Sequence, residues 1–392
     1  MPRKRRIAAY VGLGIAAGVL LGVLVVLVLT RTEFGVERVG RYTVRWLDDR
    51  VRGELRVQRA TSRGGLLGGV TLHGITIVDP DGRSFLEADS ARLSYDWRGF
   101  VTGRIVFDGI ALYDATVLIE RLPGDTLWNF EEVFAGTEPV RPSSPARDRL
   151  ILVGGISIYS GHVVVRTPWD PDPGEPDADT SRIMLRQAPG GTVREMRFED
   201  VDARLPRILW ESPFEEGRMF QVAGLSTRGF IWNTPFLLRD MRGTLTLRDS
   251  LLTFDVPRLV FPESQLASYG ALVLAEEWRF DVFLEGDRVS LVDMQWLLPD
   301  LPERGTGAFE LRIQSRPDGG TLWYATNLDV RAPRTRILGT LGIVIGGDST
   351  YFTEVALRAA PLDVELLRDF IPGDLPLEGL QVGALEIESP PR

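Results

Sequence analysis

From residue 53 onward, apolar and polar residues alternate with a period of two along most of the chain. In residues 278–284, for example, Trp278, Phe280, Val282 and Leu284 are separated by polar or charged residues, except at position 283. Successive side chains of a β-strand point to opposite faces of the sheet, so this pattern predicts strands with one apolar face. The expected fold class is mainly β, with antiparallel strands. Further strands are predicted at residues 91–97, 104–107, 116–121, 244–247, 252–256, 309–313, 322–330 and 355–359.

Residues 7–29 form a run of 23 uncharged residues, nearly all apolar. Such a run is long enough to cross the ~30 Å hydrocarbon core of a bilayer. The basic segment 1–6 precedes it and predicts a cytoplasmic N-terminus. A cleaved signal peptide is the alternative, but its apolar region spans only about 7–15 residues and ends in small residues. We therefore expect a transmembrane helix that anchors the chain once in the bacterial inner membrane, with most of the chain in the periplasm.

The composition excludes several kinds of chemistry. The chain has no Cys, two His and a single Lys, Lys4. It therefore lacks a thiol nucleophile, a disulfide, a Schiff-base lysine and the ligand spacing of a zinc site, and we expect no catalytic residue, metal or cofactor. Beyond the basic tail, 41 basic residues face 54 acidic residues, which argues against a nucleic-acid partner. A carbohydrate hydrolase that uses two carboxylates is an alternative, although no feature singles out one pair.

Four segments follow the anchor. Residues 30–52 are spaced as an amphipathic helix, which is expected to cap the β-structure or to rest at the membrane interface. Residues 53–134 form a first β-region with a turn at 79–82 and a short helix at 127–134. Residues 135–149 are a Pro-rich linker by composition. Residues 150–392 form a second β-region, which contains the acidic segment 170–179. We expect this segment to be a solvated loop rather than a metal site.

A sequence repeat is visible near the C-terminus. Asp-Leu-Pro at 300–302 recurs at 374–376, and at the same offset of 74 residues Leu311 matches Leu385 and Ile313 matches Ile387. A helix-like segment precedes each copy, at 291–298 and at 362–370. This pattern indicates repeated strand groups that stack along one axis.

Several of these stretches resemble the AsmA-like family of inner-membrane-anchored periplasmic proteins (the AsmA/TamB type). The resemblance rests on Gly-Gly-Leu-Leu-Gly-Gly-Val-Thr-Leu at 64–72, Ile-Thr-Ile-Val-Asp-Pro at 75–80, and Trp-Asn-Phe at 128–130. It extends to the Leu-Pro-x-x-Gly step at 301–305, which in that family opens a new group of strands. The resemblance implies an elongated, twisted antiparallel β-groove that supports phospholipid transport and outer-membrane lipid homeostasis.

A physical argument points the same way. A sheet whose apolar face is not covered by a second layer must bury that face against something else, and phospholipid acyl chains fit this requirement. A closed sandwich core explains the same alternation equally well. A periplasmic scaffold that pairs an edge strand with an outer-membrane or periplasmic protein is the alternative function. The candidate residues that line a lipid-binding groove are Leu245, Leu247, Phe254, Val256, Trp278, Phe280, Val282, Leu284, Phe309, Leu311 and Ile313.

Overall fold

A computed structural model describes residues 53–61, 69–95, 107–134, 155–169, 184–209, 218–230, 235–248, 250–274, 278–298, 301–317, 319–346, 350–362 and 383–388. The predicted anchor at 7–29, the helix at 30–52, the linker at 135–149 and the acidic segment at 170–179 lie outside these residues. Within them, no helix combines the length and the apolar character needed to cross a bilayer.

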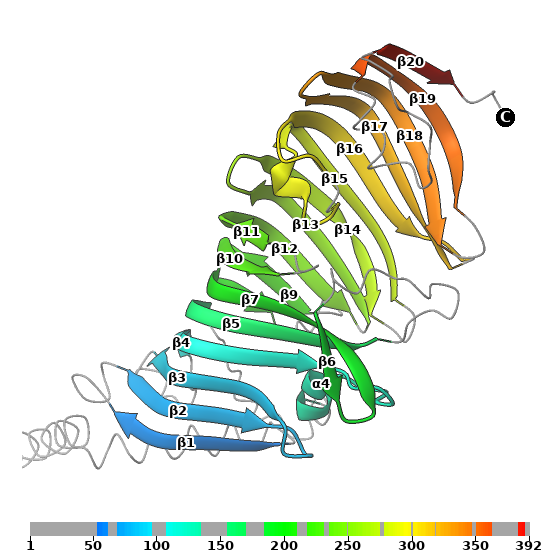
Figure 1. Cartoon of the computed structure of the whole chain (residues 1–392). Coiled ribbons are helices and arrows are strands. Elements are labelled where there is room, and N and C mark those ends of the chain that lie inside the picture. The colour runs from blue at the N-terminus through cyan, green and yellow to red at the C-terminus, as the bar shows by residue number, and fades with distance from the viewer. Residues whose placement is uncertain are drawn as a thin grey trace, which may run out of the picture. The chain divides into compact units, whose positions relative to one another are not determined.

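The prediction of a mainly β fold is confirmed. The described residues form twenty strands in two open sheets with antiparallel pairing (Figure 1). The chain divides into two compact units, one formed by Met1–Leu118 with Leu127–Gly154 and the other by Ile119–Thr126 with Gly155–Arg392. Each unit is described separately below.

The first unit is built on four strands in the order β1-β2-β3-β4 and one short helix. Val133 of the helix is fully buried against the apolar face of these strands. The helix begins at Asn129, where the Glu131 side chain accepts a hydrogen bond from the Trp128 N–H at 2.8 Å and so satisfies a free donor at the start of the helix. The elements are β1 (Glu54–Thr61), β2 (Val70–Val78), β3 (Ser84–Tyr95), β4 (Phe107–Glu120) and α4 (Asn129–Phe134).

Alternation is interrupted at Gly74 in β2. Leu72 and Ile75 are both buried in the core although they lie three residues apart. Gly74 between them has a φ of +59°, which L-residues with a side chain adopt at a cost, and this local reversal turns the following residues to the other side. The turn predicted at 79–82 is present, with the Gly82 N–H donating to the Asp79 carbonyl at 3.0 Å.

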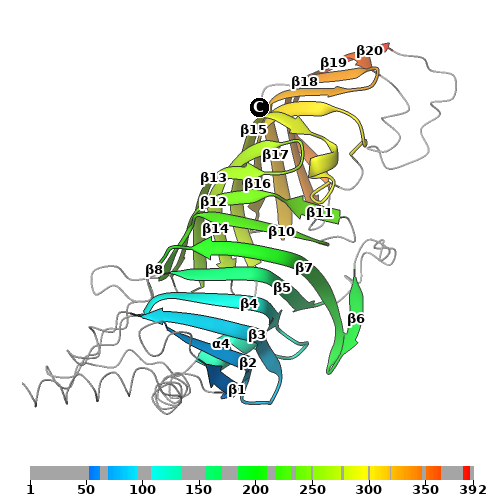
Figure 2. The same ribbon diagram turned by 90° about the vertical axis from the view of Figure 1, so that its left-hand side faces the viewer.

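The second unit contains the order β5-β7-β10-β11, with β6 paired to β7, and a longer sheet that runs from β8 to β20. Figure 1 shows the strands from β12 to β19 side by side in the longer sheet, and Figure 2 shows the same sheet turned by 90°. The strands outside the longer sheet are β5 (Ile156–Pro168), β6 (Leu185–Ala188), β7 (Gly191–Leu205), β10 (Gly224–Phe230) and β11 (Pro235–Leu238). The longer sheet comprises β8 (Arg207–Leu209), β9 (Arg218–Val222), β12 (Asp240–Arg248), β13 (Leu251–Val260), β14 (Gln265–Leu274), β15 (Trp278–Ser290), β16 (Thr306–Ser315), β17 (Gly320–Ala332), β18 (Thr335–Gly346), β19 (Tyr351–Leu362) and β20 (Gly383–Glu388).

The predicted strands of the second β-region all fall within observed strands, and only their lengths were underestimated. The helix-like segment at 291–298 is a 3-10 turn, Val292–Met294, followed by further turns. In the first unit, residues 104–106 of a predicted strand lie outside the described residues, and β4 begins at Phe107.

Candidate functional site

The candidate lining residues gather on one face of the longer sheet. Strand register places Leu245 opposite Phe254, Val282 opposite Ile313, and Leu284 opposite Leu311. Because side chains on directly paired positions share a face, these strand pairs build rows that run across the sheet. All eleven predicted residues occupy positions on this face, which we call the apolar face; Trp278 is placed there by its pairing with Leu274.

Three rows define the apolar face, each named after its residue in β15. Neighbouring rows lie two residues apart along a strand, which is about 7 Å. The Leu284 row contains Val256, Ser268, Leu284, Leu311, Ala325, Leu341 and Val355. The Val282 row contains Leu245, Phe254, Gly270, Val282, Ile313, Trp323, Ile343 and Phe352. The Phe280 row contains Leu247, Leu252, Leu272, Phe280, Ser315, Thr321 and Ile345.

Sequence reasoning missed part of this face. Leu272 in β14 and Ile343 in β18 belong to it, but neither strand was predicted. Gly270 interrupts the apolar pattern of β14, and Gly339 and Gly342 interrupt that of β18, so the alternation signal is weak there. Trp323 lies in a strand that was predicted. The strand register, which pairs it with Ile313, places it on the apolar face.

The two ends of these strands differ in burial. In the β12–β13, β13–β14, β15–β16, β16–β17 and β17–β18 pairings, β-bulges interrupt the ladder just beyond the Leu284 row, for example between Gly286 and Val289 in β15. Beyond the bulges lies a closed core, in which Val289 is 0% exposed and Leu266 is 2% exposed. This closed core consists of Leu238, Phe261, Leu266, Val289 and Met294, with Leu225, Phe236, Met241, Leu259, Trp296, Leu297, Leu301 and Phe309 packed around them.

On the other side of the bulges the face is open. The members of the Phe280 row are half-buried or exposed, and the same holds for the Val282 row apart from Ile313. Exposure is greatest at the β18–β19 hairpin, where Phe352 is 61% exposed and Ile345 is 47% exposed. We call the Val282 and Phe280 rows the open strip. It carries apolar or small neutral side chains and no charged residue.

The opposite face of the sheet, which we call the polar face, carries ion pairs beside aromatic and apolar residues such as Phe283 and Val344. Arg312 donates to both carboxylate oxygens of Asp281, at 2.8 and 2.7 Å, and its guanidinium lies 5.0 Å from the centre of the Phe283 ring. The hydrogen bonds that Arg312 donates to Asp281 raise the pKa of Arg312. At Asp329 the pKa lies well below its ordinary value because Arg331 and then Arg336 donate to the carboxylate. These charged groups are suited to water rather than to hydrocarbon.

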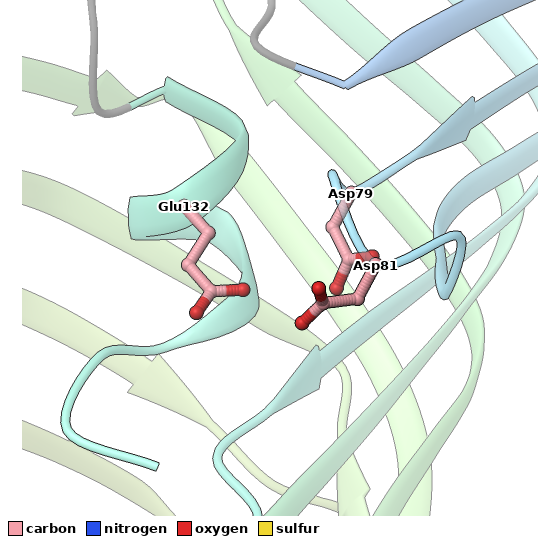
Figure 3. Close-up of side chains that lie close together, drawn as sticks. All are labelled: Asp79, Asp81 and Glu132. Atoms are coloured by element: carbon pink, nitrogen blue, oxygen red, sulfur yellow. The ribbon is translucent and has the colours of Figure 1, made fainter.

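In the first unit, three carboxylates lie close enough together that they could hold a metal ion (Figure 3). Oxygens of Asp79, Asp81 and Glu132 lie within 4.8 Å of one another. Arg83 lies among them and contacts Asp79 at 2.7 Å, Glu132 at 2.9 Å and Asp81 at 3.5 Å. The guanidinium supplies the positive charge that these carboxylates need, so the cluster joins the β2–β3 turn to α4.

The second unit contains another ionic group. Glu195 in β7 is buried and contacts Arg166 at 2.8 Å and Arg186 at 2.9 Å, while Arg166 also reaches the buried Glu120 at 3.2 Å. These contacts join the four strands β4, β5, β6 and β7 and neutralise both buried carboxylates. The two histidines lie apart from both clusters in the chain: His73 hydrogen-bonds Thr61 at 2.9 Å across β1 and β2, and His162 is exposed on β5.

The chain matches no family model, no curated protein and no solved structure in comparisons with known proteins.

Proposed function

We propose that this chain binds lipid acyl chains along the open strip and, as an AsmA-like protein anchored in the bacterial inner membrane, supports phospholipid transport through the periplasm. The observation that carries the proposal is the open strip itself, an uncharged apolar surface that continues across β12 to β18. Six strand spacings of about 4.8 Å give it a width of about 29 Å across the strands. A hydrocarbon chain can lie within that width.

Energetics favour such an occupant. Removing apolar surface from water contributes about 25 cal/mol per Å², or about 0.8 kcal/mol for each fully buried methylene group. An acyl chain in contact with the strip on one side gains part of this and covers residues such as Phe254 and Trp323. Because the rows carry no charge, no ion pair holds the chain at a single position. That is the energy profile that movement along a surface requires.

The acidic balance of the predicted periplasmic part also fits a surface that binds tails rather than phosphate groups. Lipid mass spectrometry on the full-length chain purified in mild detergent tests the proposal. We expect lipid to co-purify in an amount that exceeds the lipid held by the anchor. The Phe254→Arg variant measures that background, because it carries the same predicted anchor and a disrupted strip.

Equal lipid in the two proteins contradicts the proposal. A lipid-free chain that co-purifies with one protein in a fixed ratio supports the alternative instead, a scaffold that adds an edge strand to the sheet of a partner.

A further inference from the structure

The connector between β15 and β16 crosses the apolar face and is held in place by hydrogen bonds. Asp293 is buried and accepts from the Ser264 hydroxyl at 2.7 Å and from the Glu263 N–H at 2.8 Å. The Ser264 hydroxyl in turn accepts from the Ser290 N–H at 2.8 Å. At the other end, the Leu291 N–H donates to the Gly305 carbonyl at 3.1 Å. Side-chain and backbone bonds therefore fix the connector against the β13–β14 turn.

Aromatic packing fixes the middle of the connector. Trp296 meets the Phe236 ring edge-on, with the ring centres 5.3 Å apart, and stacks on Phe261 at 6.2 Å. Both contacts belong to the closed core. The next residue, Leu297, therefore has a defined position, because the residue before it cannot move without opening that core.

Leu297 is the connector residue that reaches the open part of the face. It packs against the closed core and also against the cluster of Leu284, Leu311 and Ile313. Leu298, which follows it, is 40% exposed. Leu297 therefore covers the Leu284 row at β15 and β16. The same row is also buried on β13 and β14, at Val256 and Ser268, and half-buried on β17 and β18, at Ala325 and Leu341.

The uncovered surface narrows as a result. On β17 and β18 three rows are accessible, and the outer two are about 14 Å apart. At β15 the Val282 and Phe280 rows remain, about 7 Å apart. At β16 Ile313 of the Val282 row is itself buried, so the uncovered surface is narrowest there. A hydrocarbon chain that lies across the strands passes through this narrow part, with Leu297 on one side of it.

We propose that Leu297 is the residue that determines which hydrocarbon chains the open strip accepts, by excluding methyl-branched chains at β15 and β16. This inference rests on the proposed function. A straight chain passes beside Leu297, while methyl branches require width that the Leu297 side chain occupies. Selectivity of this kind is steric, and one badly placed methyl group in an apolar site changes affinity by about tenfold or more.

Competition binding on the full-length chain in detergent tests the inference. The probe is a fluorescent straight-chain fatty acid, and the competitors are palmitate and phytanate, which share a carboxylate and a main chain but differ in methyl branches. We expect the unchanged protein to bind palmitate about tenfold more tightly than phytanate. Leu297→Ala should bring the two affinities to within about twofold, and Leu297→Phe should widen the difference.

Leu298→Ala is the matched control, because it removes the same atoms from the neighbouring, exposed residue. It should leave the ratio of affinities unchanged. A ratio that is the same in the unchanged protein, Leu297→Ala and Leu297→Phe overturns the role of Leu297 while leaving lipid binding intact. Failure of the unchanged protein to bind either fatty acid overturns the proposed function itself. If Leu297→Ala does not fold, Leu297→Phe alone decides, since a ratio no larger than that of the unchanged protein contradicts the inference.

Discussion

Replacing Phe254 by arginine is expected to reduce lipid binding by about 30- to 100-fold, which corresponds to about 2–3 kcal/mol of lost apolar contact. Phe254 lies in the Val282 row, half-buried and opposite Gly270, so no neighbouring side chain on β14 shields the ring from a bound chain. An arginine there places a charge on a surface that has none, and a hydrocarbon chain cannot replace its hydration.

The fold should survive this substitution, because the long arginine side chain can extend from a half-buried position into water. Thr253→Arg is the control. Thr253 is the adjacent residue of β13, exposed on the polar face, and the same charge there should leave bound lipid unchanged. The measurement is the amount of lipid per chain by mass spectrometry. A similar loss of lipid in both variants indicates a general effect of charge and contradicts the assignment of the open strip.

Replacing Arg83 by alanine is expected to destabilise the first unit by about 3 kcal/mol, at the lower end of the range for breaking a buried ion pair. The Asp79 side chain is fully buried, and Arg83 provides its charged partner at 2.7 Å. The Arg83 backbone N–H donates to Asp79 at 2.8 Å. Alanine keeps this backbone donor, which limits the loss of stability. Since Arg83 also holds Glu132, α4 should open together with the β2–β3 turn.

Hydrogen exchange resolves this effect to segments, so it is suited to a chain with two units. Amides of β2 and α4 should exchange faster in Arg83→Ala, and those of β14 to β16 should not change. Arg92→Ala, at an exposed arginine of β3, should have little effect. Adding Asp79→Asn to Arg83→Ala should recover part of the loss, because it removes the uncompensated charge. No recovery would mean that packing by Arg83, rather than charge, holds this site together.

Much of the fold follows from local sequence rules. The strand at 278–284 was predictable because its alternation is regular, and the turn at 79–82 because Asp, Pro and Gly occupy the positions that favour it. The short helix was predicted two residues too early, since α4 begins at Asn129. Gly74 shows what the rules miss: an αL residue inside a strand shifts the alternation, and no pattern of apolar residues reveals its φ.

The candidate site was predictable as a set of residues but not as a surface. Leu284 and Val289 lie on the same strand, and sequence alternation alone does not show that one lies at the border of an open strip and the other in a closed core. The difference depends on the bulge between them and on the connector that covers the far side. The packing of Trp296 and Leu297 on strands far from them in the sequence is a tertiary effect, which a strand pattern does not encode.

Site-specific photo-crosslinking in cells tests the central claim most directly. Val282 and Phe283 are neighbours in β15 and point to opposite faces of the sheet, Val282 into the open strip and Phe283 into a stack with Tyr269 at 4.8 Å. A photoreactive phenylalanine analogue at position 282 should yield lipid adducts of the full-length chain, and the same analogue at position 283 should yield few or none. Equal adducts at the two positions, or none at 282, would contradict lipid binding on the apolar face.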